Sequence, residues 1–270
     1  MKRFGLVTGL ALVSITVLAA VVALVWTPYD PTRVVASERL QGPGWPHLLG
    51  TDSFGIDIAS RLMVGARMCL TVGVLAVLIA AGIGTPLGVL AGTRRNWLSL
   101  LILRAADLLY AFPALLLAIL LAAALGGSTG TALVAIGVST VPAFVRVARA
   151  GTLQVMSQDY IQAARAAGTP RLQIGLRHVL PNIAPLIGVQ ASVSFGIAIL
   201  AEAGLSYLGL GTPPPTPTWG GMLRDAQNHL FDAPMQALWP GLAIAIAVLG
   251  FNLLGDALRD YLDPRLREVA

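Results

Sequence analysis

Few side chains in this chain could do chemistry, and they are isolated from one another in apolar sequence. Glu202 lies late in an apolar run that covers 183–207, with no basic residue close to it. A charged group at the centre of a membrane helix costs at least ~2.5 kcal/mol on insertion scales, so each such group is a candidate functional residue. Glu202 could line a path for a charged solute, or it could cap or bridge neighbouring helices.

Other polar residues in apolar runs share this ambiguity. They could offer hydrogen bonds to a solute in a pore, and hydrogen bonds between helices account for them equally well. These candidates are Gln190, Ser192, Ser194 and Asn252. A second acidic residue, Asp107, follows Arg104 by three positions, and this spacing permits an ion pair along one helix face.

Motifs for catalysis are missing from the sequence. No Gly-x-x-x-x-Gly-Lys-Ser/Thr segment occurs, so we expect no P-loop for ATP phosphates. His47, His178 and His229 are far apart and predict no metal-ligand cluster. We therefore expect no catalytic residue, no metal site and no cofactor on this chain. The single cysteine, Cys69, excludes an internal disulfide, and we expect it to be a small buried residue.

Composition places these residues in a membrane protein. Of the 270 residues, 56% are hydrophobic and 11% are charged, and the mean hydropathy is +0.77. Soluble domains carry about 25% charged residues. The net charge of +5 is spread over several loops, which argues against a nucleic-acid partner. We predict an all-α integral membrane protein with a single domain, 1–270.

Six apolar runs reach the ~20 residues needed to cross a hydrocarbon core of about 30 Å. The first is longer than the apolar part of a secretory signal and is not followed by an Ala-x-Ala site, so we expect it to be retained. The fourth is the weakest, because Pro142, Arg146 and Arg149 interrupt its second half. Glycines and Pro86 in the second predict close helix approach and a kink. The predicted spans are 4–26, 68–92, 102–125, 131–150, 183–207 and 236–257.

Basic residues orient these spans. A cytoplasmic N-terminus places thirteen Lys and Arg residues on the cytoplasmic side and five on the other, namely Arg33, Arg39, Arg61, Arg67 and Arg224. The positive-inside rule then predicts that both termini, the tail 258–270 and the segment 151–182 are cytoplasmic. The segment 27–67 is extracytoplasmic and ends in an interfacial stretch at 58–67. The proline-rich segment 209–235 is an irregular loop on the same side.

The cytoplasmic segment 151–182 has the pattern of two short helices joined by a corner. Tyr160, Ala163, Ala164 and Ala167 recur at i, i+3, i+4 and i+7, which gives the first helix a face of mostly small residues. Gly168 stands where a glycine in the left-handed region would end that helix. Such a corner offers a surface on which a partner can bind, and it can transmit movement to the spans on either side.

The second helix of the corner is predicted from its own start signal and apolar repeat. Thr169 supplies an N-cap oxygen and Pro170 a first helical residue. Its apolar face comprises Leu172, Leu176, Val179 and Leu180.

This segment resembles the cytoplasmic loop of ABC-importer permeases that is named after its Glu-Ala-Ala sequence. The family pattern continues with Gly and then Leu-Pro, and Gln162 departs from its acidic residue. Matches elsewhere resemble the C-type subunit of dipeptide, oligopeptide and nickel permeases, in the segments 49–67, 201–211, 214–220, 251–256 and 263–265. Ile56 replaces the arginine usual in the first of these. The loop positions that match are Gln162, Ala163, Ala164, Gly168, Leu180 and Pro181.

The resemblance implies a six-helix permease like that of type I importers, in the bacterial plasma membrane. It implies that Tyr160 and the six matching positions couple the chain to cytoplasmic ATPase subunits, which hold ATP and Mg. A homologous B-type subunit would share the pore, and an extracytoplasmic binding protein would deliver di- or oligopeptides. Nickel, glutathione or another small solute is the alternative cargo. An ion-coupled secondary transporter is a further alternative, although only Glu202 suits an ion relay and no repeat is apparent.

Overall fold

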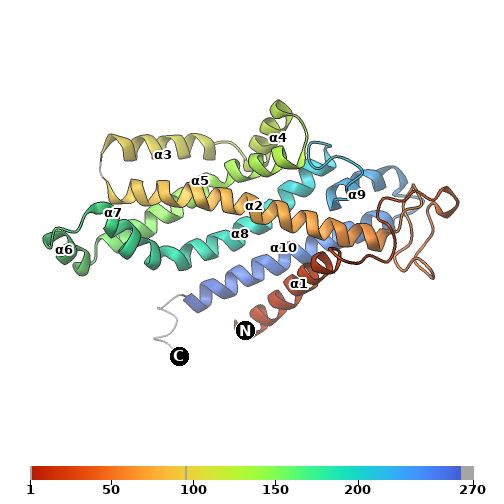
Figure 1. The fold of residues 1–270 in the computed structure, drawn as a ribbon, viewed down its shortest axis with the longest axis horizontal. Helices are drawn as coiled ribbons and strands as arrows, with labels where there is room; N and C mark the ends of the chain where they lie inside the picture. The colour runs from red at the N-terminus through yellow and green to blue at the C-terminus, as the bar shows by residue number, and fades with distance from the viewer. Residues whose placement is uncertain (1, 95, 263–270) are drawn as a thin grey trace.

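The computed structural model describes residues 2–94 and 96–262 as a long bundle of helices (Figure 1). Within these residues the only extended pairing is an isolated bridge between Thr51 and Asp57. Lys2, Arg3 and the match at 263–265 lie outside the residues whose side chains are described. The long helices are α1 (Lys2–Val22), α2 (Ile58–Thr93), α5 (Thr129–Met156), α8 (Leu180–Tyr207) and α10 (Met235–Leu262). The shorter ones are α3 (Trp97–Tyr110), α4 (Ala114–Leu125), α6 (Asp159–Ala166), α7 (Arg171–Ile174) and α9 (Trp219–Ala226), with 3-10 turns at Ala36–Glu38 and Gln227–His229 and a π turn at Gly175–Val179.

The five long helices are each apolar and long enough to cross a membrane, and this confirms most of the predicted spans. The predicted span at 102–125 is not one continuous helix. Two helices, α3 and α4, replace it and meet at 88°. Pro113 causes the break, because proline lacks an N–H donor and disfavours the helical region at the residue before it, Phe112.

The helix that carries the second predicted span starts before that span. The stretch 58–67, expected at the membrane interface, is the first part of the 36-residue helix α2. Asp57 caps this helix, since its carboxylate accepts a hydrogen bond from the Ser60 amide at 2.9 Å. A strong capping residue therefore moves the helix start ten positions ahead of the apolar run on which the prediction depended.

The fourth span is not interrupted at its polar residues. Helix α5 continues through Pro142, Arg146 and Arg149 to Met156, and Pro142 is buried. Proline is tolerated inside membrane helices because neighbouring helices and local adjustments satisfy the backbone groups that it frees.

The centre of the bundle is the contact between α2 and α5. A Cβ on Gly84 would lie 2.7 Å from the carbonyl oxygen of Val141, and one on Gly88 would lie 2.5 Å from that of Val145. These two glycines confirm the predicted close approach, whereas Gly82 has no atom within 4 Å of its would-be Cβ. Small residues let helix backbones come together, so packing supplies the attraction that the hydrophobic effect cannot supply in lipid.

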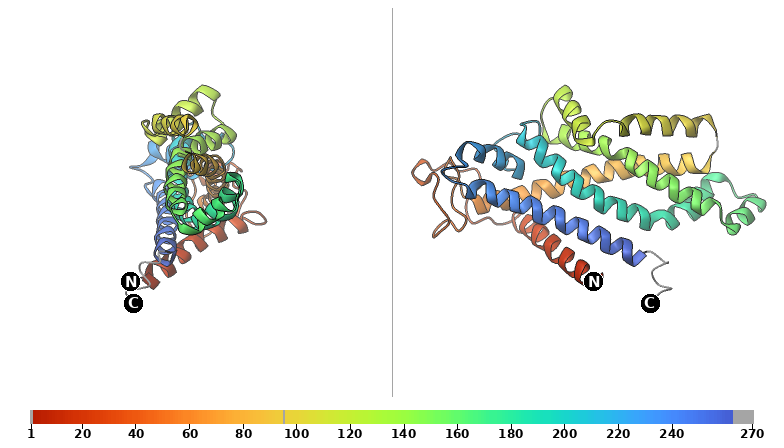
Figure 2. Two further views of the ribbon diagram at one scale, coloured as in Figure 1. Left: turned by 90° about the vertical axis from the view of Figure 1, so that its left-hand side faces the viewer. Right: turned by 180° about the vertical axis from the view of Figure 1, so that it is seen from behind.

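Helices α1 and α10 pack side by side along one flank of the bundle, as both views in Figure 2 show. The contact again uses glycine: a Cβ on Gly9 would lie 2.9 Å from the amide nitrogen of Leu254. Helices α6 and α7 lie at one end of the molecule, and the segment before α2 lies with α9 at the other (Figure 1). The bundle thus separates its two polar ends by the length of its long helices.

Candidate functional site

The corner after α6 has the predicted geometry. Gly168 has φ +79°, in the left-handed region. Its amide donates to the carbonyl of Arg165 at 3.0 Å, and the Thr169 amide donates to that of Ala164 at 3.0 Å. These two bonds form a Schellman motif, which ends a helix by satisfying carbonyls that would otherwise have no partner. The sequence therefore stops α6 at a defined residue and turns the chain sharply.

The second part of the corner differs from the prediction. Pro170, not Thr169, is the N-cap residue of α7, and no side-chain hydrogen bond caps that helix. The chain then passes from α7 through the π turn Gly175–Val179 directly into α8. There is no separate second helix, because the π turn absorbs an extra residue without ending the helical path. The corner is consequently a direct extension of α8.

The apolar contact that fixes the corner also differs from the predicted one. Leu172 and Leu176 are exposed, while Ile174 and Val179 are buried with Ile161 of α6. These three residues form one cluster with Ala148, Val155 and Ile183. The π turn changes the helical register, so a pattern counted at 3.6 residues per turn selects the wrong face. The cluster attaches α6 and α7 to the inner ends of α5 and α8.

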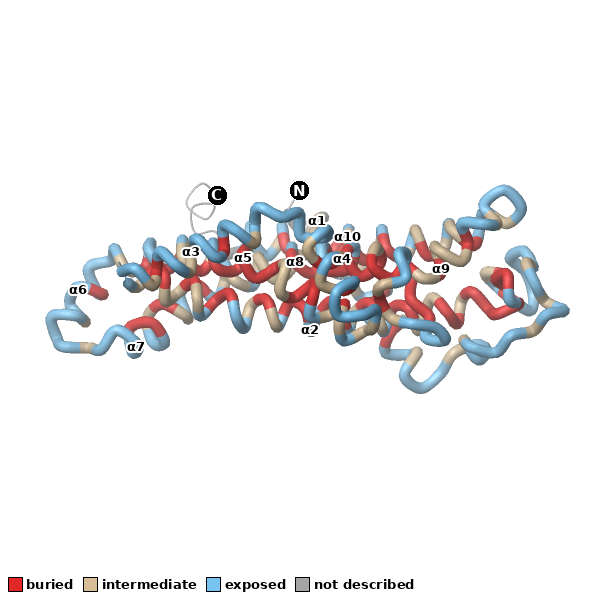
Figure 3. Tube along the Cα trace, turned by 90° about the horizontal axis from the view of Figure 1, so that it is seen from above, coloured by how far each residue is buried: buried red, intermediate tan, exposed pale blue. Residues whose placement is uncertain are grey.

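The face of small residues on α6 is open. Ala163 and Ala167 are exposed and Ala164 is half-buried, and Figure 3 shows exposed residues along most of α6 and α7. The Tyr160 ring lies beside that of His178, with the ring centroids 6.2 Å apart. The remaining predicted positions, Gln162, Leu180 and Pro181, are exposed, half-buried and exposed, respectively. The structure thus presents an exposed surface that includes most of the predicted coupling residues and is attached to α5 and α8 by the buried cluster.

Glu202 is enclosed within the chain. Its side chain is 1% exposed, and its Oε1 accepts a hydrogen bond from the Ser206 hydroxyl at 2.7 Å. Its Oε2 has no hydrogen-bond partner among the described residues. Glu202 therefore does not reach the surface of this chain, and its place on a solute path stays a prediction.

The other polar candidates make contacts inside the bundle. The Ser192 hydroxyl donates to the carbonyl of Phe251 at 2.8 Å, which joins α8 to α10. The Gln190 amide donates to the Ser194 hydroxyl at 3.0 Å, and Ser194 is buried. Asn252 is half-buried, with its Oδ1 3.0 Å from the would-be Cβ of Gly196. The Ser192 contact favours the alternative of a hydrogen bond between helices. Gln190 is half-buried, so part of its side chain is exposed at the surface of this chain.

A charged cluster between α3 and α5 was not predicted from sequence. Asp107 pairs with Arg146 at 3.0 Å and not with Arg104, so the predicted ion pair is wrong. The Arg146 guanidinium also lies over the Tyr110 ring, 3.8 Å from its centroid. Sequence spacing reveals partners within one helix, whereas this pair joins two helices whose contact depends on the bend after α3.

The opposite end of the molecule is a folded cap held by buried charges. Arg61 of α2 pairs with Asp52 of the segment before α2, and with Asp225 of α9 at 3.0 Å. His47 has its Nδ1 3.1 Å from Asp57 and its Nε2 3.3 Å from Glu38. The acidic residues Asp52 and Asp57 therefore have a structural role: they tie the segment before α2 to α2 itself, and Arg61 extends the network to α9.

Helix α9 is fixed by close backbone contacts. The Trp219 indole donates to the carbonyl of Leu62 at 3.0 Å and lies against Gly65, where a Cβ would be 2.6 Å from the ring. A Cβ on Gly220 would lie 2.0 Å from the carbonyl oxygen of Ala203. Larger residues would not fit at these glycines, so the start of α9 is packed between α2 and α8. The prediction of an irregular loop over 209–235 is therefore wrong at α9, whereas residues 213–216 are exposed.

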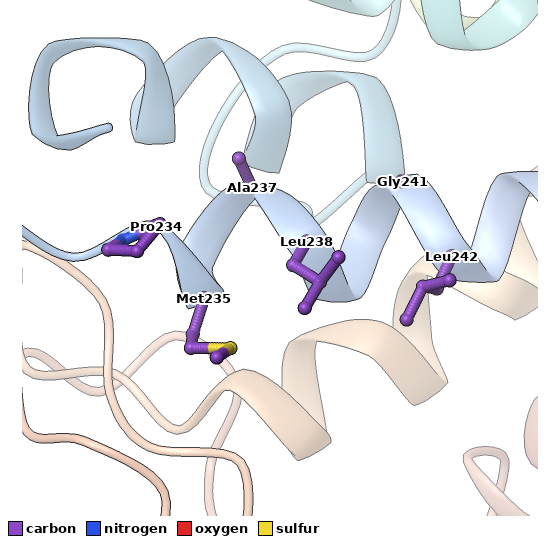
Figure 4. Close-up of a pocket in the computed structure, with 6 residues that line it drawn as sticks. All are labelled: Pro234, Met235, Ala237, Leu238, Gly241 and Leu242. Carbon is purple, nitrogen blue, oxygen red and sulfur yellow. The ribbon is translucent and has the colours of Figure 1, made fainter. Parts of the chain in front are cut away.

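Hollows in the described part of the chain include one at α10 and one beside α5. The larger, of about 450 Å³, lies at the start of α10 and is lined only by apolar side chains and glycine (Figure 4). Met235, Leu238 and Leu242 point to one side of the helix there, and Ala237 points away. This hollow offers no polar group to a ligand. The smaller, of about 110 Å³, lies between α4, α5 and α8 and includes the side chains of Ser139 and Thr140.

A bundle of membrane-length helices, with an exposed corner at one end and a folded cap at the other, defines a multi-pass membrane protein. The profile of the family described as the binding-protein-dependent transport system inner membrane component matches residues 84–268. The chain belongs to this family and is an ABC-importer permease of the dipeptide and oligopeptide group.

Cys69 is 1% exposed, which confirms the expected buried cysteine.

Named relatives cover almost the whole chain. It is 44% identical to the dipeptide transport system permease protein DppC of Alkalihalophilus pseudofirmus, over 97% of this chain and 86% of the relative. It is 44% identical to the glutathione transport system permease protein GsiD of Pectobacterium atrosepticum, over 89% and 80%. A putative peptide transport system permease protein of Brucella suis is 43% identical, over 99% and 90%.

Proposed function

We propose that this chain is the pore-forming subunit of an ATP-driven importer for di- and oligopeptides, and that the corner 151–182 couples it to ATPase subunits. The observation that carries the proposal is the corner itself. Its Schellman motif and buried cluster mount an open face of small residues on the inner ends of α5 and α8. A rigid mount is needed if movement of a partner on that face is to move the spans.

The roles of the partner subunits follow from this coupling. Cytoplasmic ATPase subunits, with their own ATP and Mg, would bind Tyr160, the face of small residues and the loop after Gly168. Closure of these subunits would tilt α5 and α8 together, and a homologous B-type subunit would complete the pore between them. An extracytoplasmic binding protein would deliver solute at the cap end. Each ligand shifts the balance between inward- and outward-facing states only by its difference in affinity for the two.

Glutathione is the second candidate cargo. One named relative is a glutathione permease, and its identity of 44% equals that of the dipeptide permease. Glutathione is itself a peptide with charged ends, so the two cargoes share chemistry. Uptake of each by the same vesicles would separate them.

The test is reconstitution of the chain in vesicles, alone and with its ATPase, B-type and binding-protein partners. We expect the chain alone to show neither ATP hydrolysis nor uptake, because it contains no P-loop sequence. The complete set should take up labelled dipeptide only with ATP and binding protein present. ATPase activity in the purified single chain, or uptake driven by an ion gradient without ATP, would contradict the proposal.

A further inference from the structure

The charged cluster between α3 and α5 is exposed in the single chain. The side chains of Arg146 and Asp107 are 45% and 53% exposed, respectively, and Tyr110 is 55% exposed. The cluster is held together by the 3.0 Å ion pair and by the ring beneath Arg146. It is therefore a preformed surface feature, and something other than this chain must cover or solvate it.

The cluster lies within the membrane-crossing part of the bundle. Gly88 packs against Val145, next to Arg146, and α2 ends at Thr93, five residues or about 8 Å further along. Asp107 lies ten residues, or about 15 Å, along α3 from Trp97, an exposed aromatic residue of the kind that marks a membrane interface. Both estimates place the ion pair in the inner half of a hydrocarbon core of about 30 Å.

Lipid is an unsuitable cover for this surface. Charged residues at this depth face the bundle interior or a water-filled cavity, because exposure to hydrocarbon costs several kcal/mol. The same face of α5 carries small or polar residues at i, i+4, i+7, i+11 and i+15, which are Ser139, Ala143, Arg146, Ala150 and Gln154. The exposed face of α10 differs, since it presents Leu238, Leu242 and Leu249.

Two neighbouring features extend this surface along the bundle. Ser139 forms part of the wall of the 110 Å³ hollow, together with Ile197 and Leu200 of α8. Gly151 of α5 packs against Ile183 and Leu186, so Gln190 of α8 lies at about the depth of Arg146. A half-buried amide and a small, mostly apolar cavity thus border this face of α5.

We propose that this α5 face, with Asp107 and Tyr110 of α3, lines the translocation path, and that Arg146 and Asp107 bind the carboxylate and ammonium ends of a passing peptide. The inference rests on the proposed function. In the empty path the two side chains neutralise each other. A zwitterionic peptide can replace their ion pair with two others of the same kind, so passage leaves no charge unpaired.

Accessibility tests the first part of the proposal. Ser139→Cys, Ala143→Cys and Ala150→Cys would be made in a Cys69→Ser background, with Leu242→Cys and Leu249→Cys as lipid-facing controls. The assembled complex in vesicles would be treated with a charged, membrane-impermeant thiol reagent on both faces. We expect the three α5 positions to react roughly tenfold faster than the controls, since the thiolate that reacts forms only where water reaches. Equal, slow labelling at all five positions would show that the partner subunit or lipid covers this face, and would overturn the proposal.

Transport tests the second part. In Arg146→Gln and Asp107→Asn we expect dipeptide uptake to fall roughly tenfold, the loss typical of one charge-assisted contact. Binding-protein-stimulated ATPase activity should remain, and Arg33→Gln, at an exposed position in the outer segment, should match wild type. The exchanged pair Asp107→Arg with Arg146→Asp should not recover uptake, because it inverts the two binding positions.

The outcomes separate this proposal from its alternatives. Full recovery of uptake in the exchanged pair would mean that the residues only fasten α3 to α5, and wild-type uptake in both single variants would exclude any contact with solute. Either result overturns the proposal. If the wild-type complex shows no ATP-driven peptide uptake, the proposed function fails instead, and the labelling of the three cysteines still decides whether the face is water-filled.

Discussion

At Gly168 the need for glycine is purely conformational. A Cβ there would meet no atom within 4 Å, yet φ is +79°. A side chain in the left-handed region costs about 1 kcal/mol or more, and β-branching restricts it further. Within this chain, the effect of a substitution therefore comes from the angle between α6 and the start of α7, which is the property that the proposed coupling uses.

We predict that Gly168→Val inserts and assembles normally but separates ATP hydrolysis from peptide uptake. Gly126→Val is the matched control, because Gly126 also has a positive φ, +87°, and an open environment, but it lies at the end of α4. Both activities should be measured in the same vesicles. Wild-type coupling in Gly168→Val, or an equal defect in Gly126→Val, would exclude a specific role for the corner.

Arg61 stabilises the cap through its charge. Its side chain is 11% exposed and pairs with Asp52 and Asp225. Removing one partner of a buried ion pair typically costs about 3–5 kcal/mol, since the remaining charges stay buried. We predict that Arg61→Gln lowers the melting temperature in detergent and makes the segment 27–57 more sensitive to added protease. The exposed Arg67→Gln, on the same helix, should resemble wild type in both measurements; an unchanged Arg61→Gln would contradict the structural role of the cap network.

At the scale of elements, the α2–α5 contact gives the sharpest prediction. Gly88→Ala would place a methyl group 2.5 Å from the carbonyl oxygen of Val145, so the two helices must separate. Overpacking of this kind costs about 1–3 kcal/mol. Gly82→Ala, on the same helix with open space around it, is the control. We expect thermal unfolding of the purified protein to shift to lower temperature for Gly88→Ala only, and equal melting temperatures would show that the contact can relax.

The elements also show what could be predicted from sequence. Apolar length located five long helices, and glycine spacing identified the close contact at Gly84 and Gly88. The bend after α3 was missed because the apolar run around Pro113 is long enough for a membrane span whether its helix is straight or bent. The apolar face of the second corner helix was wrong at Leu172 and Leu176 but right at Val179, because the π turn at Gly175–Val179 changes the register. The Asp107–Arg146 pair depends on the packing of two helices, which no spacing within one helix reveals.

At the scale of the whole molecule, helix α8 connects the corner to the cap. Helices α5 and α8 are attached to the corner at their inner ends through the cluster of Ile161, Ile174 and Ile183. At its outer end α8 packs against α9, where Gly220 meets the Ala203 backbone. A tilt imposed at the corner would therefore reach the cap through continuous helices and close contacts, without a flexible joint between them.

This arrangement requires the corner and the cap to lie on opposite sides of the membrane. The described ends of α1 and α10 both point toward the end that carries α6 (Figure 1), so these ends and the corner lie on one side. The basic residues predict that this side is cytoplasmic. We predict that Ser157→Cys and Thr216→Cys, each in a Cys69→Ser background, react with an impermeant thiol reagent from opposite faces. Both positions are exposed, whereas Cys69 is 1% exposed, so the background change should leave the two surfaces unaltered. Whole cells should label Thr216→Cys, and only inverted membrane vesicles should label Ser157→Cys. Labelling of both from one side would contradict the orientation, and with it the route from ATPase subunits to the extracytoplasmic cap.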